Sequence, residues 1–249
     1  MDLLDRVCLV TGGTSGIGAA AALTLAKRGA DIAVLGSSGC RKAEELKQQV
    51  IALGRRFYCA AGDVAQPDEC RRFVEEAARA LGGVDVLVHS AGGLIPAGFL
   101  EVDPKDWYRA FDVHVHAAFH LCRAVVPFMQ KKSGGAIVLI SSAAGLRGCK
   151  GATAYGVVKG AIPQFVRAVA RELADFDIRV NAVAPGVIRT PLQDGLTAEQ
   201  VSNNLKNRIP LHREGTAQDV ADAIALLITN EFMTGETVTV DGGMTMRIV

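Results

Sequence analysis

The side chains of Tyr155 and Lys159 are four residues apart in a segment with a helical pattern, so both lie on one helix face. A phenol with a pKa of ~10 is a poor acid–base catalyst at neutral pH, but a neighbouring ammonium group favours the phenolate and lowers that pKa. Tyr155 would then give a proton to a carbonyl oxygen during reduction, or take one from an alcohol during oxidation. The hydroxyl of Ser142, thirteen residues before Tyr155, could hydrogen bond to the same oxygen. A surface contact is the structural alternative for this tyrosine–lysine pair.

A glycine-rich turn follows the first apolar run of the chain and precedes a helical pattern. Gly12, Gly16 and Gly18 give it the pattern G-x-x-x-G-x-G. Glycines let the backbone approach a pyrophosphate without Cβ clashes, and the following helix offers free N–H groups and the positive end of its dipole. The position of the turn between a strand and a helix favours a dinucleotide site over a purely structural turn.

The end of the second predicted strand bears on the choice of cofactor. An NAD-selective site usually has an acidic residue here for the adenosine ribose hydroxyls, but this chain has Gly36, Ser37 and Ser38. Serine hydroxyls, backbone N–H groups and the nearby Arg41 could accept a 2′-phosphate that a carboxylate would repel. NADP(H) is therefore favoured, while NAD(H), or a site that selects neither, remains open.

The elements that must position these residues alternate along the chain. Short apolar runs predict strands at 6–10, 31–35, 56–60, 84–89, 136–141, 178–183 and 237–240. Longer amphipathic stretches predict helices at about 17–29, 40–53, 67–81, 104–132, 153–176 and 217–229. Strands that alternate with helices predict a parallel sheet with right-handed crossovers. We expect residues 1–249 to form a single α/β domain, a doubly wound (Rossmann) fold with its site at the carboxyl ends of the strands.

Two stretches of this pattern carry more detailed expectations. In the helix at 104–132, one face is predicted to hold Trp107, Phe111, Ala118, Cys122, Val125 and Met129. Residues 190–212 are polar with interspersed apolar side chains and have no clear sheet role. An amphipathic helical flap over the substrate is favoured there, with a surface excursion as the alternative.

Seven motifs in order make the chain resemble the short-chain dehydrogenase/reductase family over essentially its whole length. They are the T-G-x-x-x-G-x-G turn at 11–18, Asp63 with Val64 after the third strand, His89-Ser90-Ala91-Gly92 in place of N-N-A-G, Ser142, the Y-x-x-x-K of Tyr155 and Lys159, the N-x-x-x-P-G of 181–186, and the G-E-T-x-x-V-D-G-G of 235–243. Segments 210–213 and 241–244 look most like the branch of 3-oxoacyl-carrier-protein reductases and related carbonyl reductases.

The resemblance implies that a ketone, of 3-oxoacyl type or a related carbonyl, is reduced to a secondary alcohol by NAD(P)H. Tyr155 is then the proton donor and Lys159 also holds the nicotinamide ribose. The implied cofactor-binding residues are Gly12, Thr14, Ser15, Gly16, Ile17, Gly18, Ser37, Ser38, Asp63, Val64, Ala91, Gly92, Tyr155, Lys159, Pro185, Gly186, Ile188 and Thr190. An NAD-linked dehydrogenase of a sugar, polyol or other secondary alcohol, and a cofactor-binding regulator without catalysis, stay open as alternatives.

The chain departs from the family pattern beside the catalytic residues. His114 stands where the family usually has an asparagine whose backbone carbonyl holds a water in a proton relay to the lysine. A backbone role would survive this change, but the asparagine side chain also supports a local helix irregularity, and His114 puts that support in question. His114 is therefore included among the catalytic candidates. The spacing of His114, His116 and His120 does not place all three on one helix face, so we expect no metal site.

Composition excludes several classes of partner. The chain has 27 basic and 26 acidic residues, so a net charge of +1 gives no reason to expect binding to nucleic acid or to an anionic membrane. It has no apolar run near 18 residues and no signal-peptide pattern at its start. We expect a cytoplasmic protein whose six cysteines, which form no C-x-x-C pair, are reduced thiols in the core.

Two further expectations concern partners and substrate. The basic residues Lys131, Lys132, Arg167 and Arg171 could meet an acidic acyl-carrier protein, with a solvated face as the alternative; the resemblance also implies a homotetramer built on the fourth and fifth long helices. An apolar cleft is expected from Leu94, Ile95, Leu146, Val187, Leu192, Leu196 and Leu205. Such walls favour medium-chain 3-oxoacyl thioesters or esters over sugars, whose hydroxyls would lose water without gaining partners.

Overall fold

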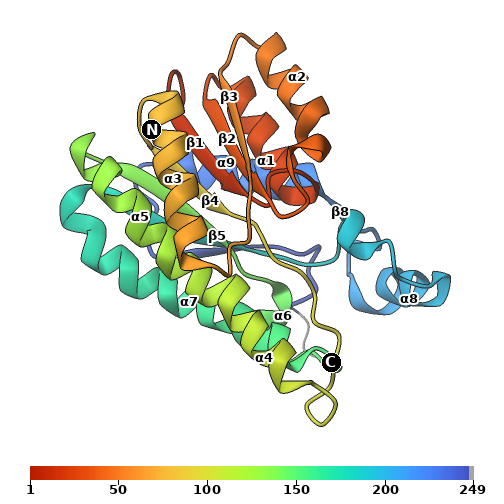
Figure 1. Ribbon diagram of the computed structural model, residues 1–249. Coiled ribbons are helices and arrows are strands. Elements are labelled where there is room, and N and C mark those ends of the chain that lie inside the picture. The colour runs from red at the N-terminus through yellow and green to blue at the C-terminus, as the bar shows by residue number, and fades with distance from the viewer. Residues whose placement is uncertain (247–249) are drawn as a thin grey trace.

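The computed structural model describes residues 1–246, which form a seven-stranded parallel sheet with helices on both faces (Figure 1). The strand order is β3-β2-β1-β4-β5-β6-β9. The strands are β1 (Val7–Thr11), β2 (Asp31–Gly36), β3 (Phe57–Ala61), β4 (Val86–His89), β5 (Gly135–Ile140), β6 (Ile178–Pro185) and β9 (Thr237–Val240). The order reverses between β1 and β4, which is the switch point where ligands bind in such sheets. The predicted doubly wound fold is confirmed, and every predicted strand is present.

The two faces of the sheet bury separate apolar cores, as the alternation of side chains along a strand requires. In β1, Leu9 belongs to the core beneath α3 (Pro67–Leu81), α5 (Ala117–Lys131) and α7 (Thr153–Leu173). Its neighbours Cys8 and Val10 belong to the core beneath α1 (Gly16–Lys27), α2 (Glu44–Ala52) and α9 (Ala217–Thr229). Helices therefore cover both faces of the sheet, and the carboxyl ends of the strands are left free to form a site.

The helix expected over 104–132 is interrupted in the middle. It consists of α4 (Pro104–Phe111), a π-helical segment (Asp112–His116) and α5, and the Ala117 N–H bonds to the carbonyl of Asp112, five residues earlier. The predicted single apolar face is therefore wrong. Trp107 and Phe111 pack with Ala154 and Val158 of α7, whereas Ala118 and the residues after it pack on the main core.

The segment 190–212 contains short helices. It holds a 3-10 turn (Pro191–Gln193), α8 (Ala198–Asn203) and a π-helical turn (Asn204–Arg208). Two short strands, β7 (Ile188–Arg189) and β8 (Gly215–Thr216), pair with each other at its base, and α8 stands away from the sheet (Figure 1). Closure of this segment over a substrate stays a prediction.

The prediction that all cysteines are reduced is wrong for two of them. Cys40 lies in a 3-10 turn (Cys40–Ala43) after β2 and forms a disulfide with Cys59 of β3. Sequence alone shows only two cysteines 19 residues apart; the parallel pairing of β2 with β3 brings them together, with Cα atoms 5.9 Å apart. Cys8, Cys70 and Cys122 are free and buried, as expected, and Cys149 is free and half-buried. No helix within the described residues is long and apolar enough to cross a membrane.

Candidate active site

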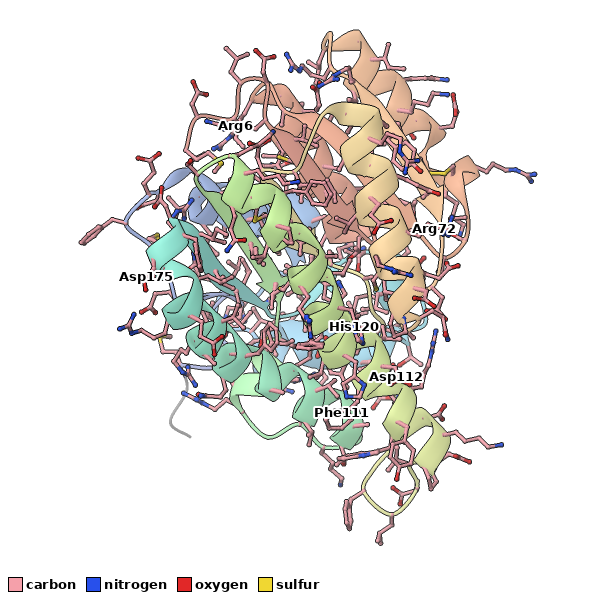
Figure 2. All side chains as sticks on the ribbon, turned by 60° about the vertical axis from the view of Figure 1, so that its left-hand side comes forward. Arg6, Arg72, Phe111, Asp112, His120 and Asp175 are labelled. Carbon is pink, nitrogen blue, oxygen red and sulfur yellow. A yellow bond between two sulfur atoms is a disulfide. The ribbon has the colours of Figure 1, made fainter. Side chains whose placement is uncertain are left out.

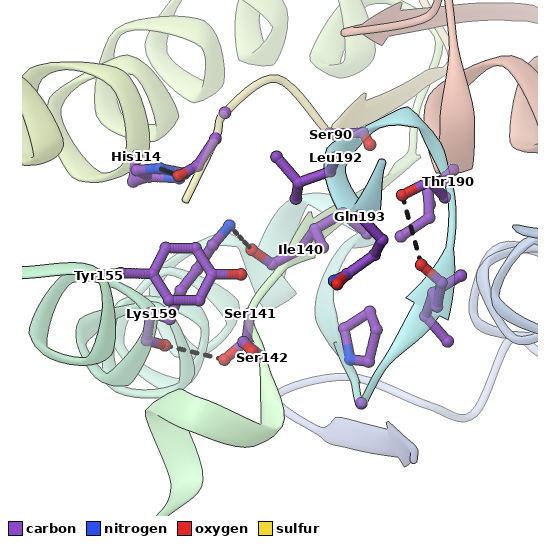
Figure 3. A pocket seen from close by; sticks show the side chains of 16 residues that line it. Ser90, His114, Ile140, Ser141, Ser142, Tyr155, Lys159, Thr190, Leu192 and Gln193 are labelled. Atoms are coloured by element: carbon purple, nitrogen blue, oxygen red, sulfur yellow. Dashed lines mark hydrogen bonds between the residues drawn. The ribbon is translucent and has the colours of Figure 1, made fainter. Parts of the chain in front are cut away.

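A cavity lies at the carboxyl ends of β4, β5 and β6 and brings together the three predicted catalytic side chains (Figure 3). Ser142 follows β5, and Tyr155 and Lys159 come from the first two turns of α7. The fourth candidate, His114, enters from the π-helical segment. Residues far apart in the sequence therefore meet because the strand ends share one edge of the sheet.

The position of Ser142 depends on close packing between α6 (Ala143–Leu146) and α7. Ser142 is the N-cap of α6, and its hydroxyl accepts a hydrogen bond from the Ala144 N–H at 3.2 Å. A Cβ on Gly145 would lie 2.4 Å from the carbonyl carbon of Lys159, so only glycine allows the two helices this contact. The Ser141 hydroxyl donates to the Lys159 carbonyl at 2.8 Å and fixes the same pair of segments. Sequence analysis missed α6, whose four residues are too few to show a helical period.

Lys159 is the most perturbed cation of the site. Its side chain is only 6% exposed, and its ammonium group donates to the Ile140 carbonyl at 2.8 Å. Burial lowers the pKa of Lys159 to about 7, because the charged form loses hydration. The ammonium nitrogen lies 5.7 Å from the centre of the Tyr155 ring. A proton can therefore be held or released at this nitrogen near neutral pH.

Tyr155 is placed to exchange a proton with a ligand in the cavity. Its hydroxyl points into the cavity from the start of α7 (Figure 3). Burial raises the pKa of Tyr155, contrary to the lowering by Lys159 that was predicted from the sequence, while a hydrogen bond with Ser142 acts in the opposite direction. The free protein therefore keeps the phenol protonated, which is the form needed to donate a proton.

The imidazole of His114 lines the cavity. The sequence predicted a role for the backbone carbonyl of this residue. It is 2% exposed, and its Nε2 lies 3.2 Å from the Gly93 carbonyl, which can only accept, so Nε2 is the donor. Nδ1 is buried without a hydrogen-bond partner among the described residues. Burial, with the positive charge of Lys159, lowers the pKa of His114 to about 2, so the ring is neutral. A Cβ on Gly92 would lie 2.1 Å from its Cε1, so the ring fits only against a glycine. The helix irregularity persists with histidine in place of asparagine.

His89 is a second neutral imidazole below the site. Its Nδ1 is 2.7 Å from the Thr11 hydroxyl, which also accepts a hydrogen bond from the Ala91 N–H at 3.3 Å. Burial lowers the pKa of His89 to about 3, with a further contribution from Lys159. His89 therefore links the ends of β1 and β4 as a structural group.

The glycine turn borders a longer cleft that runs from the catalytic cavity to the end of β2. Gly12 and Gly16 have φ angles of +67° and +54°, which L side chains rarely adopt. A Cβ on Gly18 would lie 2.3 Å from the Gly12 carbonyl oxygen, so this glycine lets α1 start directly behind the turn. The turn and the start of α1 therefore form a cradle of free N–H groups suited to a pyrophosphate.

The far end of the cleft, where the adenosine part of a cofactor is expected, shows two features that sequence analysis missed. Asp63 forms an ion pair with Arg109 of α4 at 2.8 Å, and both line the cleft. Lys42, rather than the expected Arg41, lines the cleft beside Ser37 and Ser38. Neither Arg109 nor Lys42 belongs to a recognisable motif. Whether their side chains face the cleft depends on the rotation of the helical segments that carry them, which the sequence does not give.

The predicted cofactor residues fall into three places. Gly12, Thr14, Ser15, Gly16, Ile17, Ser37, Ser38, Asp63, Val64, Ala91, Gly92 and Thr190 line the long cleft. Tyr155, Lys159, Pro185, Gly186 and Ile188 line the catalytic cavity, which also includes Ile17, Gly92 and Thr190. Gly18 lies behind the turn and supports it.

The expected apolar cleft differs from the one observed. Of the seven apolar side chains expected to line it, only Leu192 lines the catalytic cavity in the described part of the chain, joined by Ile17, Ile140 and Ile188. Ile95 packs instead in the cluster of Trp107 and Phe111, because the loop after β4 turns back onto α4 and α7. The apolar surface is therefore smaller than the sequence suggested.

None of the four basic residues expected to meet a carrier protein lines the catalytic cavity. Lys132 donates a hydrogen bond to the buried carboxylate of Asp85 at 2.6 Å. Asp85 directly precedes β4, so this contact lies at the amino ends of the strands, opposite the catalytic cavity. The Arg167 guanidinium bonds to Gln164 on the same helix. Residues 1–246 contain no cluster of three or more histidine, cysteine or acidic side chains that could hold a metal ion.

Comparisons with known proteins agree with this geometry. The sequence profile of the enoyl-(acyl carrier protein) reductase family matches residues 12–245. An uncharacterized oxidoreductase of Mycobacterium tuberculosis is 36% identical over 97% of this chain and 92% of its own length. A 3-oxoacyl-[acyl-carrier-protein] reductase of Thermotoga maritima is 35% identical over 98% of this chain and 99% of its own. The crystal structure of a putative short-chain alcohol dehydrogenase from Sinorhizobium meliloti superposes with a TM-score of 0.94 at 33% identity, covering 99% of both chains.

Proposed function

The chain belongs to the short-chain dehydrogenase/reductase family, and on this premise we propose that it is an NAD(P)H-dependent oxidoreductase that reduces a ketone to a secondary alcohol. The observation that carries the proposal is the meeting of Ser142, Tyr155 and Lys159 in one cavity that opens into the glycine-lined cleft. A nicotinamide cofactor bound there supplies or accepts the hydride.

The residues of this chain bind the substrate oxygen and move one proton. Ser142 and Tyr155 hydrogen bond to the carbonyl oxygen, and the Tyr155 hydroxyl donates its proton to that oxygen as negative charge develops. The buried ammonium group of Lys159 stabilises the phenolate that remains, and its position beside the Ile140 carbonyl limits its freedom to move. Because the pKa of Lys159 is near 7, the group can be charged for this step.

The shape of the cleft supports a nicotinamide dinucleotide, and its adenosine end supports NADP(H) over NAD(H). Gly12, Gly16 and Gly18 leave no side chain between the cofactor's pyrophosphate and the start of α1. Ser37, Ser38 and Lys42 offer hydroxyls and a positive charge to a 2′-phosphate, and residues 37–43 after β2 include no carboxylate. Asp63, held by Arg109, is the proposed partner of the adenine amino group.

The proposed substrate is a 3-oxoacyl thioester or a related carbonyl compound. The similarity to the Thermotoga maritima reductase supports this class, and so do Ile140, Ile188 and Leu192 beside a single polar centre. An acidic acyl-carrier protein as substrate carrier, and a homotetramer, are part of the proposal. Tyr108 of α4 and Phe119 of α5 are 69% and 44% exposed, and such apolar side chains suit an interface between subunits on these helices.

The experiment is the substitution Tyr155→Phe, with Tyr108→Phe as the matched control on an exposed tyrosine. Loss of the transferable proton should lower turnover of a 3-oxoacyl ester by ~10²–10⁴-fold while NADPH affinity is retained. The control should keep the activity of the unchanged protein. Near-normal turnover by the Tyr155 variant would contradict the assigned proton donor.

A second candidate is the oxidation of a secondary alcohol, sugar or polyol with NAD. It uses the same residues in reverse and is supported by the similarity to a putative short-chain alcohol dehydrogenase. Kinetic constants for alcohol oxidation and ketone reduction, each with both cofactors, distinguish the two candidates. A non-catalytic regulator is disfavoured because the three catalytic side chains are intact and share one cavity.

A further inference from the structure

The segment that follows β2 lines the adenosine end of the cleft and is tied to the neighbouring strand by a disulfide. Cys40 comes two residues after Ser38 and two before Lys42, both of which line the cleft. Its partner Cys59 lies in β3, paired in register with Val34 of β2. The sulfur–sulfur bond is drawn in yellow in Figure 2. A covalent link therefore lies inside the stretch of chain that would hold a 2′-phosphate.

Few other contacts fix this segment. Within the described residues, the side chains of Ser37, Ser38, Arg41 and Lys42 form no hydrogen bond or ion pair with other protein groups. The turn has no side-chain cap, and Gly39 has a φ of +80° with open space around it. Ala43, 1% exposed, is the buried anchor at its far end. The disulfide is therefore the main side-chain link between the cleft-lining residues and the sheet.

Both sulfur atoms belong to half-buried residues at the edge of the sheet, since β3 is the outermost strand. The free thiols of Cys8, Cys70 and Cys122 are instead buried in the cores, where burial raises their pKa values. The Cys40–Cys59 pair is therefore less buried than the free thiols of the cores.

We propose that Cys40 and Cys59 form a thiol–disulfide exchange site that sets the affinity of this protein for the 2′-phosphorylated cofactor. In the exchange, a dithiol reductant gives two electrons and two protons, the Cys40–Cys59 bond breaks to two thiols, and the dithiol becomes a disulfide. The reverse reaction uses a disulfide oxidant such as oxidised glutathione. The inference depends on the proposed function, because it assumes that the cleft binds a nicotinamide dinucleotide.

The direction of the effect follows from the cost of ordering the segment. With the bond intact, Ser37, Ser38 and Lys42 are held at the cleft before the cofactor binds. With the bond broken, binding must also order the backbone that carries these side chains, and this loss of freedom weakens binding. NADPH should therefore bind about tenfold more weakly to the reduced protein. NADH, which has no 2′-phosphate for these residues, should change by less than about twofold.

The experiment measures the dissociation constants of NADPH and NADH by nucleotide fluorescence, without substrate, in protein equilibrated with oxidised glutathione or with dithiothreitol. Alkylation of the unfolded protein should count four thiols in the oxidised form and six in the reduced form. In Cys40→Ser and Cys59→Ser, both constants should match the reduced protein under either condition. The control Cys149→Ser removes the remaining half-buried thiol and should behave like the unchanged protein.

Each outcome decides the inference. Six thiols after oxidation, or one NADPH constant in both redox states, would overturn the exchange site while leaving the proposed function standing. Failure of both nucleotides to bind in either state would instead refute the proposed function, and the exchange site with it. If Cys40→Ser fails to fold, Cys59→Ser provides the same test. A near-UV circular dichroism spectrum like that of the reduced protein shows that each variant is folded.

Discussion

Replacement of Lys159 by methionine should make the cofactor-free protein more stable at pH 6 while it abolishes catalysis. Burial lowers the pKa of this group from 10.5 to about 7, and only 6% of the residue is exposed. The unfolded chain therefore binds the proton more tightly than the folded chain does. The folded state is penalised for holding the charged lysine, and methionine fills similar space without a charge.

The size of the penalty depends on pH in a way that the pKa values fix. Below pH 7 both states carry the proton and the full penalty applies, whereas above pH 10.5 both are neutral and it disappears. At ~1.4 kcal/mol per pH unit, the penalty is about 5 kcal/mol at pH 6 and about 2 kcal/mol at pH 9. Charged and neutral lysine both donate the hydrogen bond to the Ile140 carbonyl. Its loss in Lys159→Met therefore changes the stability difference between the two proteins by the same amount at pH 6 and at pH 9.

The assay is urea unfolding of both proteins at pH 6 and pH 9, with the free energies of unfolding extrapolated to water. The advantage of Lys159→Met over the unchanged protein should be about 3 kcal/mol larger at pH 6 than at pH 9. The neighbouring rings of His89, His114 and Tyr155 keep their neutral forms across this range, because burial lowers the pKa values of the histidines and raises that of the tyrosine. An advantage that does not vary with pH would refute the reasoning, since it would show that Lys159 is hydrated in the folded protein.

The other predictions concern the cofactor, His114 and the substrate. Hydrogen bonds to the charged 2′-phosphate, worth about 1.5–3 kcal/mol, should give a preference for NADPH over NADH of about 10–100-fold. Ser37→Asp should reverse this preference. Gly36→Asp is the poorer test, because the new Cβ would lie 2.4 Å from Thr14 Cγ2. Equal affinities of the unchanged protein for NADPH and NADH would contradict the proposed 2′-phosphate site. His114→Asn should leave the reduction rate similar, because the helix irregularity suits either residue, and a fall of more than ~100-fold would assign the imidazole a direct role. Across a series of 3-oxoacyl thioesters, each added methylene should raise kcat/KM by up to about fourfold, because burial of one methylene contributes ~0.8 kcal/mol. The increase should stop when the cavity lined by Leu192 is filled. A kcat/KM that does not change with chain length, together with rapid polyol oxidation, would favour the sugar dehydrogenase.

The strands and the motif residues could be predicted because their signals are local. A run such as 136–141, apolar up to its last residue, predicts a strand covered on both faces, and the glycine turn needs its residues in fixed order around one bend. The residues of the cavity come together once the strand order places their carboxyl ends at one edge. Tyr155 and Lys159 required only the helical period.

What could not be predicted depends on contacts between elements. Arg109 reaches Asp63 because the last turn of α4 borders the cleft, and the disulfide exists because β3 pairs with β2. The packing of α6 on α7 is visible only as Gly145, whose role appears once the Lys159 backbone lies against it. The position of Ile95 was wrong for the same reason, since a loop residue follows its nearest apolar cluster.

The π-helical segment between α4 and α5 acts as a change of phase within one continuous helical rod. It holds an extra residue in its turn, so the apolar stripe beyond it is rotated by about 100° from the stripe before it. One end of the rod can therefore face α7 beside the catalytic cavity while the other end faces the sheet. If residues 112–116 formed a regular α-helix instead, every later residue would turn by about 100° and the two stripes would align. The helix would then be more regular by itself, yet it could satisfy only one of its two packing partners.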